Sequence, residues 1–208
     1  MNSYKFSYAT PNNAKKIFSL FYTAFNSKFQ SMLPEYPEKG FILYYNYFYK
    51  GLHKKKDKII IIKDDNGKIL GFLALEGLGV PFFSRNPSLT AIGKTIASVG
   101  FRKFLRLFVG MLLIEGYPPS SDYLYINTVI INKNNQGQGL GKKFIHLAEL
   151  IARKRKFKGI CLYVDIDNEQ AIKFYDKLGF SEDSGFGGDF VKKIIGVQYY
   201  SYRYKNLK

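Results

Sequence analysis

With 208 residues, 46% of them hydrophobic and 17% aromatic, the chain has the length of one domain and a composition that excludes a disordered polypeptide. Its single cysteine excludes an internal disulfide, and no Cys/His cluster has metal-ligand spacing, so we expect a reduced, cytoplasmic setting and no metal. The net charge of +16 would attract an anionic ligand or nucleic acid, but the lysines are scattered over the sequence, and we interpret the charge as compositional.

No segment of the sequence predicts insertion into a membrane. The first five residues lack the charged start and long apolar core of a signal peptide. The most apolar window, Leu105–Ile114, is too short for a membrane span and contains Arg106. We therefore expect no membrane partner.

The first half of the chain predicts a strand, two helices, a β-hairpin and a helical insert. The hairpin carries the strongest short-range signal, because Asn66-Gly67 is typical of a tight turn between two strands. The insert, residues 89–114, has one or two amphipathic helices with a break near Gly100. In chain order, the other elements are a strand over Lys5–Tyr8, helices from Pro11 to about Phe25 and over Phe41–His53, and the hairpin strands Ile59–Lys63 and Ile69–Glu76.

A glycine-rich run, Gln136–Gly141, lies between an apolar segment and an amphipathic one. The segment before it, Tyr125–Ile131, is β-branched and predicts a buried strand, and Lys142–Ala152 predicts a helix. A turn of this kind leaves unpaired N–H groups at the helix start, where the helix dipole also favours an anion. Glycine is needed because a Cβ would hold a phosphate away from the backbone. The run therefore predicts a phosphate-binding loop.

Two familiar phosphate motifs do not fit this run. A Walker loop ending at Gly141-Lys142 would need glycine at Gln136 and Ser or Thr at Lys143. A dinucleotide fingerprint, G-x-G-x-x-G, would need its third glycine at Lys142 or Phe144. The pattern Q-x-x-G-x-G fits Gln136, Gly139 and Gly141 without a gap, and it resembles the pyrophosphate loop of the GNAT superfamily of N-acetyltransferases, which binds coenzyme A.

A second segment further along the chain strengthens this resemblance. A strand over Gly159–Val164 leads into Asp167–Phe180, which is similar to the GNAT signature in which an Asn opens a short helix after the fifth strand. Asn168 or Asp167 is a good helix N-cap and Gly179 a good C-cap. The positions that match the family's spacing are Asn168, Ala171, Tyr175, Lys177, Gly179 and Phe180.

The resemblance implies an α/β fold of the GNAT type. It predicts one domain over residues 1–208, with a central mixed, twisted sheet of about seven strands and helices on both faces. Strands 4 and 5 would splay apart, and residues 89–114 would form the helical insert between strands 3 and 4. A tyrosine-rich stretch, Gly196–Lys205, predicts the last strand.

The resemblance also implies which residues bind acetyl-CoA, the acyl donor. Main-chain groups of Val129, Ile130 and Ile131 would pair with the pantetheine amides, and Asn168 would contact the cofactor near the pantetheine. An N-cap role alone remains the alternative for Asn168. The pyrophosphate would lie on the loop and first helical turn, formed by Gln136, Gly137, Gln138, Gly139, Leu140, Gly141 and Lys142.

Catalytic roles are predicted less completely. Tyr175 matches the tyrosine that commonly protonates the leaving thiolate, because a phenol with a pKa near ~10 stays protonated at neutral pH. Cys161, in mid-strand, is interpreted as a buried hydrophobe, and His146 as a surface residue. The general base is left open among Glu76, Glu115 and Asp122, with Glu76 preferred.

The acceptor is predicted to be a primary amine, of a small molecule rather than a protein. Aromatic residues would shape its pocket and could hold a cation by cation–π contact, although the same residues could be core. They are Tyr22, Phe25, Phe29, Tyr44, Tyr45, Phe48, Phe82, Phe83 and Tyr117.

Two functions from other classes remain as alternatives. A catalytically silent GNAT module could bind acyl-CoA as a sensor, since the strand offers no obvious base. A nucleic-acid binder would use the basic helix at residues 94–106, but no RNA-reading signature supports it. The oligomeric state is left open, with a homodimer allowed.

Overall fold

The computed structural model describes residues 4–29, 58–76, 119–195 and 197–207, together with short stretches at 93, 96–97, 100–105, 108–109 and 117. Within these residues, seven strands form one sheet in the order β1-β2-β3-β4-β5-β7-β6. All neighbours are antiparallel except β4 and β5, which are parallel. The strands are β1 Lys5–Tyr8, β2 Lys58–Lys63, β3 Ile69–Glu76, β4 Tyr123–Ile131, β5 Gly159–Asp165, β6 Ser181–Gly187 and β7 Tyr199–Asn206.

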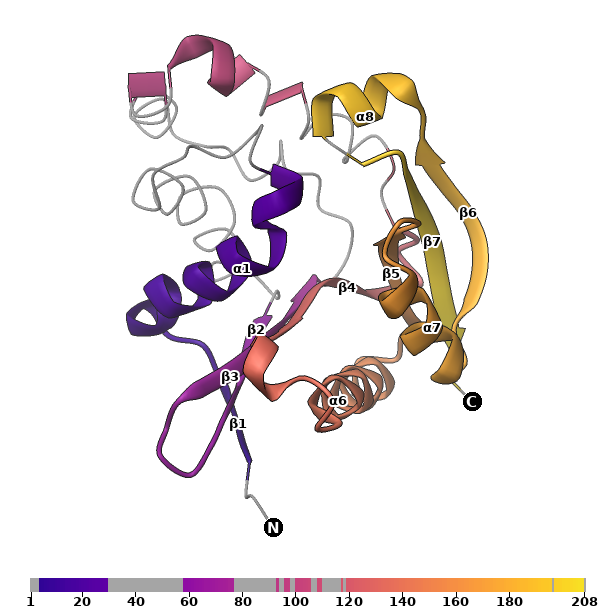
Figure 1. The fold of residues 1–208 in the computed structure, drawn as a ribbon. Helices are drawn as coiled ribbons and strands as arrows, with labels where there is room; N and C mark the ends of the chain where they lie inside the picture. The colour runs from indigo at the N-terminus through magenta and orange to yellow at the C-terminus, as the bar shows by residue number, and fades with distance from the viewer. Residues whose placement is uncertain are drawn as a thin grey trace.

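Helices lie on both faces of this sheet (Figure 1). On one face α1 packs against β2 and β3 through Ile17 and Phe18, and on the other α6 packs through Phe144 and Ile145, all of which are buried. The helices are α1 Ala14–Phe29, preceded by the 3-10 turn η1 Pro11–Asn13, then η4 Lys133–Asn135, α6 Leu140–Lys154, α7 Glu169–Lys177 and α8 Asp189–Ile195. No helix in the described part of the chain is long and apolar enough to cross a membrane.

The β-hairpin and the GNAT-type architecture predicted from the sequence are confirmed. Gly67 has φ +79°, and its N–H donates to the carbonyl of Asp64 at 3.0 Å, closing the turn between β2 and β3. Gly100, with φ +83°, lies between helical residues 97 and 101, as the predicted break requires. The predicted helix over residues 41–53 and most of the insert lie outside the described residues.

Some boundaries and two elements differ from the sequence-based expectation. The first helix opens as the 3-10 turn at Pro11 and continues to Phe29, four residues beyond the predicted end. β6 and α8 were not predicted at all. β6 has the polar sequence SEDSGFG with no apolar alternation, and it exists because its backbone pairs with β7. α8 is a short helix whose Val191 packs against Phe186.

A β-bulge in β4 changes which side chains face each layer. Ala74 pairs with Thr128 and Leu75 with Ile126, so Asn127 is an extra residue. Before the bulge, Ile126 faces the α6 layer, and after it Ile130 faces the α1 layer. The bulge therefore places Asn127 at the middle of the sheet, beside the end of β3.

Candidate active site

Strands β4 and β5 diverge after a short paired region. Their parallel pairing covers only Tyr123–Tyr125 opposite Gly159–Cys161. Beyond it, β4 continues to Ile131 on β3, and β5 continues to Asp165 on β7, while the two ribbons separate (Figure 1). The edge of β4 from Ile126 to Ile131 that faces β5 therefore pairs with no strand of the described chain. The predicted splay between strands 4 and 5 is confirmed, and Val129, Ile130 and Ile131 lie along its open edge.

The glycine loop lies at the far end of this open edge. Gln136 ends η4, and its side-chain amide donates to the carbonyl of Ile131 at 3.2 Å, which ties the loop to the end of β4. Gly139 is the N-cap of α6 and has φ +74°, and Gly137 has φ +77°. Both are left-handed conformations that favour glycine.

The space in front of the loop can accept a ligand atom close to the backbone. A Cβ built at Gly137 or Gly139 would meet no atom within 4 Å. The first turn of α6, which includes Leu140, Gly141 and Lys142, adds the unpaired N–H groups of a helix start. Leu140 itself is anchored in the core, and Lys142 and Gln138 are exposed. The loop thus has the geometry of an anion site, as its sequence predicts.

Glu76 lies in the row of residues at which the strands diverge. It pairs in register with Tyr125 of β4, which in turn pairs with Cys161 of β5 in the last parallel pair. The bulged Asn127 donates its side-chain N–H to Glu76 Oε1 at 2.8 Å, and Thr128 Oγ1 donates to Asn127 Oδ1 at 2.6 Å. Burial, and then the carboxylate of Glu76, raise the pKa of Tyr125 well above its ordinary value, so this phenol stays protonated.

Asp122, another candidate base, is not brought to this row. Asp122 lies before the paired end of β4 and forms an exposed ion pair with Lys158 at 2.6 Å. Glu115 lies outside the described residues. Sequence reasoning preferred Glu76 but missed its contact with Asn127, because a bulge that brings these two side chains together leaves no signal in the residue pattern.

Tyr175 lies on the apolar side of α7, between two aromatic neighbours. Its ring is 5.1 Å from the ring of Phe174 and 5.3 Å from that of Phe180. Burial raises the pKa of Tyr175 to about 12, so its hydroxyl remains a hydrogen-bond donor at neutral pH. Asn168 caps the same helix by accepting from the N–H of Ala171 at 3.2 Å, and its side chain is exposed. The structure therefore supports the capping role of Asn168 directly.

Other predicted assignments agree with the structure. Cys161 is fully buried, and burial raises the pKa of its thiol to about 12, so it does not have the character of a nucleophile. His146 is exposed on α6 next to Glu149 at 3.5 Å.

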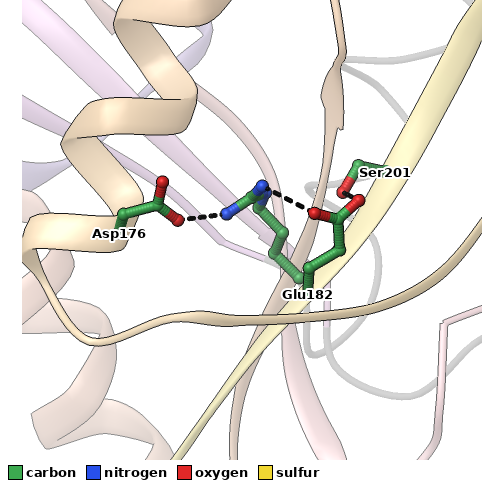
Figure 2. Close-up of polar contacts among 4 residues, drawn as sticks. Asp176, Glu182 and Ser201 are labelled. Carbon is green, nitrogen blue, oxygen red and sulfur yellow. Dashed lines mark hydrogen bonds and ion pairs between the residues drawn. The ribbon is translucent and has the colours of Figure 1, made fainter.

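An ion-pair cluster that the sequence did not reveal connects α7 with the sheet. Arg203 of β7 is 5% exposed, and its guanidinium donates to Asp176 of α7 and, at 3.1 Å, to Glu182 of β6. Ser201 donates its hydroxyl to the other oxygen of Glu182 at 2.8 Å. Figure 2 shows Asp176 and Glu182 on either side of the guanidinium, with Ser201 beyond Glu182. No motif marks Arg203, which stands in a tyrosine-rich segment.

The aromatic residues predicted to line an acceptor pocket lie in different parts of the structure. Tyr22 and Phe25 of α1 pack against the core between α1 and the sheet. Tyr117 is 48% exposed and stacks on Phe186 at 4.5 Å with the rings 6° apart. The side chains of Phe29, Tyr44, Tyr45, Phe48, Phe82 and Phe83 lie outside the described residues.

The diverging strands β4 and β5, with a glycine loop after β4, agree with the GNAT resemblance of the sequence motifs. The model of the acetyltransferase (GNAT) family matches residues 18–180, and the chain belongs to that family.

Relatives identified by sequence match only part of the chain. An acetyltransferase of Agrobacterium fabrum is 32% identical over 65 residues, 31% of this chain and 46% of the relative. N-alpha-acetyltransferase 30 of Schizosaccharomyces pombe is 36% identical over 56 residues, 27% of this chain and 37% of the relative. The matched region thus spans less than half the length of these curated relatives.

Solved structures match the fold over a larger share of the chain. A histone acetyltransferase HPA2-related structure from Corynebacterium glutamicum has a TM-score of 0.64 at 16% identity and covers 99% of this chain and 97% of its own. A Bacillus anthracis structure in complex with acetyl coenzyme A has a TM-score of 0.51 at 20% identity, covering 77% of this chain and 68% of its own. At these identities the likeness concerns the fold.

Proposed function

We propose that the protein transfers an acetyl group from acetyl-CoA directly to a primary amine, with both substrates bound together. The observation that carries this proposal is the position of Glu76 in the row at which β4 and β5 diverge. A pyrophosphate on the loop at Gly137–Gly141 and a pantetheine arm along Val129–Ile131 would bring the thioester toward that row. The acetyl group would then meet the one carboxylate that lies on the end of β3.

Each residue has a defined part in this reaction. The amine nitrogen forms a bond to the acetyl carbonyl carbon as the C–S bond breaks. Glu76 first pairs with the ammonium form of the acceptor and takes its proton, because a carboxylate fixed by Asn127 at 2.8 Å is pre-oriented for this task. The electron pair of the C–S bond leaves with sulfur as a thiolate.

The raised pKa of Tyr175 refines its predicted role. A phenol with a pKa of about 12 gives up its proton to an ordinary thiolate, with a pKa of ~8.5, only at a cost of roughly 5 kcal/mol. We therefore propose that Tyr175 donates a hydrogen bond that stabilises the developing thiolate. The nitrogen, once bonded to the acetyl carbon, loses its second proton, and water carries this proton to the sulfur.

The acceptor is proposed to be a small molecule with one amine and an apolar or aromatic body. Aromatic rings follow one another from the row of Glu76 outward, with Tyr125 6.3 Å from Tyr163, Tyr163 5.3 Å from Phe186 and Phe186 4.5 Å from Tyr117. Such rings bind apolar groups and attract cations through their faces. The net charge of +16 disfavours an acceptor with several positive charges.

The test is calorimetric titration with acetyl-CoA, followed by a panel of amines with detection of released thiol. Binding with thiol release that depends on an amine supports the proposal. Binding without release over the whole panel would favour the sensor alternative, in which the module only registers acyl-CoA. Absence of binding would contradict the assignment of the glycine loop.

A further inference from the structure

In the described part of the chain, a single side-chain polar contact joins α7 to the sheet. The side chains of Lys173 and Asn168 bond within the helix itself, to Glu169 and to the N–H of Ala171. Among the described residues, the ion pair of Asp176 with Arg203 is therefore the one side-chain polar contact between α7 and another element of the chain. The remaining attachment is the apolar side of α7, including Phe174 and Tyr175, which packs against the core.

We infer that Arg203 is a positioning residue for catalysis, which holds α7 through Asp176 and thereby fixes the hydroxyl of the adjacent Tyr175. The inference rests on the proposed function, because it assigns Tyr175 to the leaving thiolate. An apolar helix face allows sliding and rotation, since dispersion contacts are not directional. A charge-assisted hydrogen bond from a fixed fork is directional, so it removes that freedom beside Tyr175.

The guanidinium is suited to this task because the sheet holds it in place. Arg203 lies on β7, whose backbone pairs with β5 on one side and β6 on the other. Its side chain is 6% exposed, whereas those of Asp176 and Glu182 are 52% and 54% exposed. The guanidinium of Arg203 is thus held in place by the sheet, and its ion pair with Asp176 holds α7 against it. Arg203 Nε is buried with no partner in the described part of the chain, so the two terminal nitrogens make all its polar contacts there.

The chain supplies a matched control for the test. Asp176→Ala and Glu182→Ala each remove one carboxylate from the same guanidinium, at nearly equal exposure. Only Asp176 is on α7, and alanine there favours the helix, so helix loss is not a confounding effect. We expect Glu182→Ala to lower Tm at least as much as Asp176→Ala, because it also leaves the buried hydroxyl of Ser201 without this acceptor. We expect Asp176→Ala to lower kcat about tenfold or more, with the KM for acetyl-CoA within about twofold, since small displacements of a catalytic group are costly. Glu182→Ala should keep kcat within about twofold.

A double-mutant cycle distinguishes positioning from a general structural role. If Asp176 acts through Tyr175, then Asp176→Ala should not reduce kcat further when Tyr175→Phe is already present. Asp176→Glu, which keeps the carboxylate, should recover part of the lost turnover. Equal losses of kcat in Asp176→Ala and Glu182→Ala, or full additivity with Tyr175→Phe, would overturn the inference while leaving the proposed function intact. Acetyl-CoA binding without any thiol release in the wild-type protein would overturn both together.

Discussion

The α carbon of Gly141 faces the ring of Phe174, and a β carbon built on Gly141 would stand 3.1 Å from Cζ of that ring. Gly141 belongs to the first turn of α6, and Phe174 precedes Tyr175 on α7. The two helices that carry the proposed pyrophosphate and thiolate contacts therefore approach each other at a position where even a β carbon would make an unusually tight contact.

This contact predicts that Gly141→Val destabilises the protein although valine is the better helix former. We expect a loss of about 1–3 kcal/mol in the free energy of unfolding, because the branched side chain overpacks against Phe174. Urea unfolding measures the loss. Adding Phe174→Leu should restore part of it, and strictly additive losses in the double variant would show that the two residues do not compete for space.

Gly139→Trp should abolish binding of acetyl-CoA while the protein stays folded. The position has open space in front of its backbone, which a large side chain would fill, and its φ of +74° makes any side chain strained by about 1–2 kcal/mol. Gly67→Trp is the matched control, because Gly67 has φ +79° and equal open space in the distant hairpin. Calorimetric titration should find unchanged affinity only in the Gly67 variant. If both variants bind equally well, the loop does not hold the cofactor.

Glu76→Gln should lower turnover by about 10²–10⁴-fold, the usual contribution of a general base. Glutamine can still accept from Asn127 through its carbonyl oxygen, so the bulge should keep its contact. The affinity for acetyl-CoA should stay unchanged, which titration checks alongside the thiol-release rate. Retention of most of the activity would move the role of base to another residue.

Tyr117→Ala should weaken binding of the amine acceptor and leave binding of acetyl-CoA unchanged. Tyr117 is the exposed end of the aromatic row, so its removal should raise the KM for an aromatic monoamine several-fold, in line with roughly 0.5–2 kcal/mol for an aromatic contact. Phe190→Ala serves as the control, because Phe190 is 61% exposed on α8 and is not part of the row. Parallel changes in both variants would indicate a general surface effect.

Stability should fall steeply in alkaline solution. Burial raises the pKa of both Tyr175 and Tyr200 to about 12, whereas a tyrosine in the unfolded chain has a pKa near ~10. The folded state therefore keeps protons that the unfolded state loses, so the stabilisation is complete below about pH 10 and disappears as the pH rises toward 12. Thermal unfolding at stepped pH should give a constant Tm up to about pH 9.5 and a decline above it, smaller in Tyr200→Phe. A Tm with no decline through this window would contradict the prediction.

Local patterns predicted the elements that depend on neighbours in sequence. The hairpin follows from Asn66-Gly67, and α6 and α7 follow from their apolar spacing and flanking glycines. β6 could not be predicted in this way, since its residues are mostly exposed and its strand conformation comes from pairing with β7. Likewise, the ion pairs of Arg203 could not be predicted, because its partners Asp176 and Glu182 are 27 and 21 residues away in the sequence.

The candidate site was also predicted only where its residues are close together in the sequence. Gly139 and Gly141 indicate a glycine-rich loop by themselves, so six residues were enough to predict a phosphate site. The position of Glu76 depends on the register of β3 with β4 and on the bulge at Asn127, and both are properties of the assembled sheet. Resemblance to a family predicted a role for Tyr175 of α7, but its raised pKa comes from burial in the folded chain, which the sequence pattern does not show.

The single extra residue at Asn127 also has a consequence for how this strand can diverge over evolutionary time. Leu124 and Ile126 face the same layer as Val129 and Ile131, so the period of two is interrupted between them. The positions that face the α6 layer are therefore even-numbered before Asn127 and odd-numbered after it, while the buried Ile130 faces the α1 layer. Deleting Asn127 would exchange the two faces in one half of the strand, so that side chains now packed against α6 would face α1, and we expect such a deletion to be far more disruptive than a substitution at the same position.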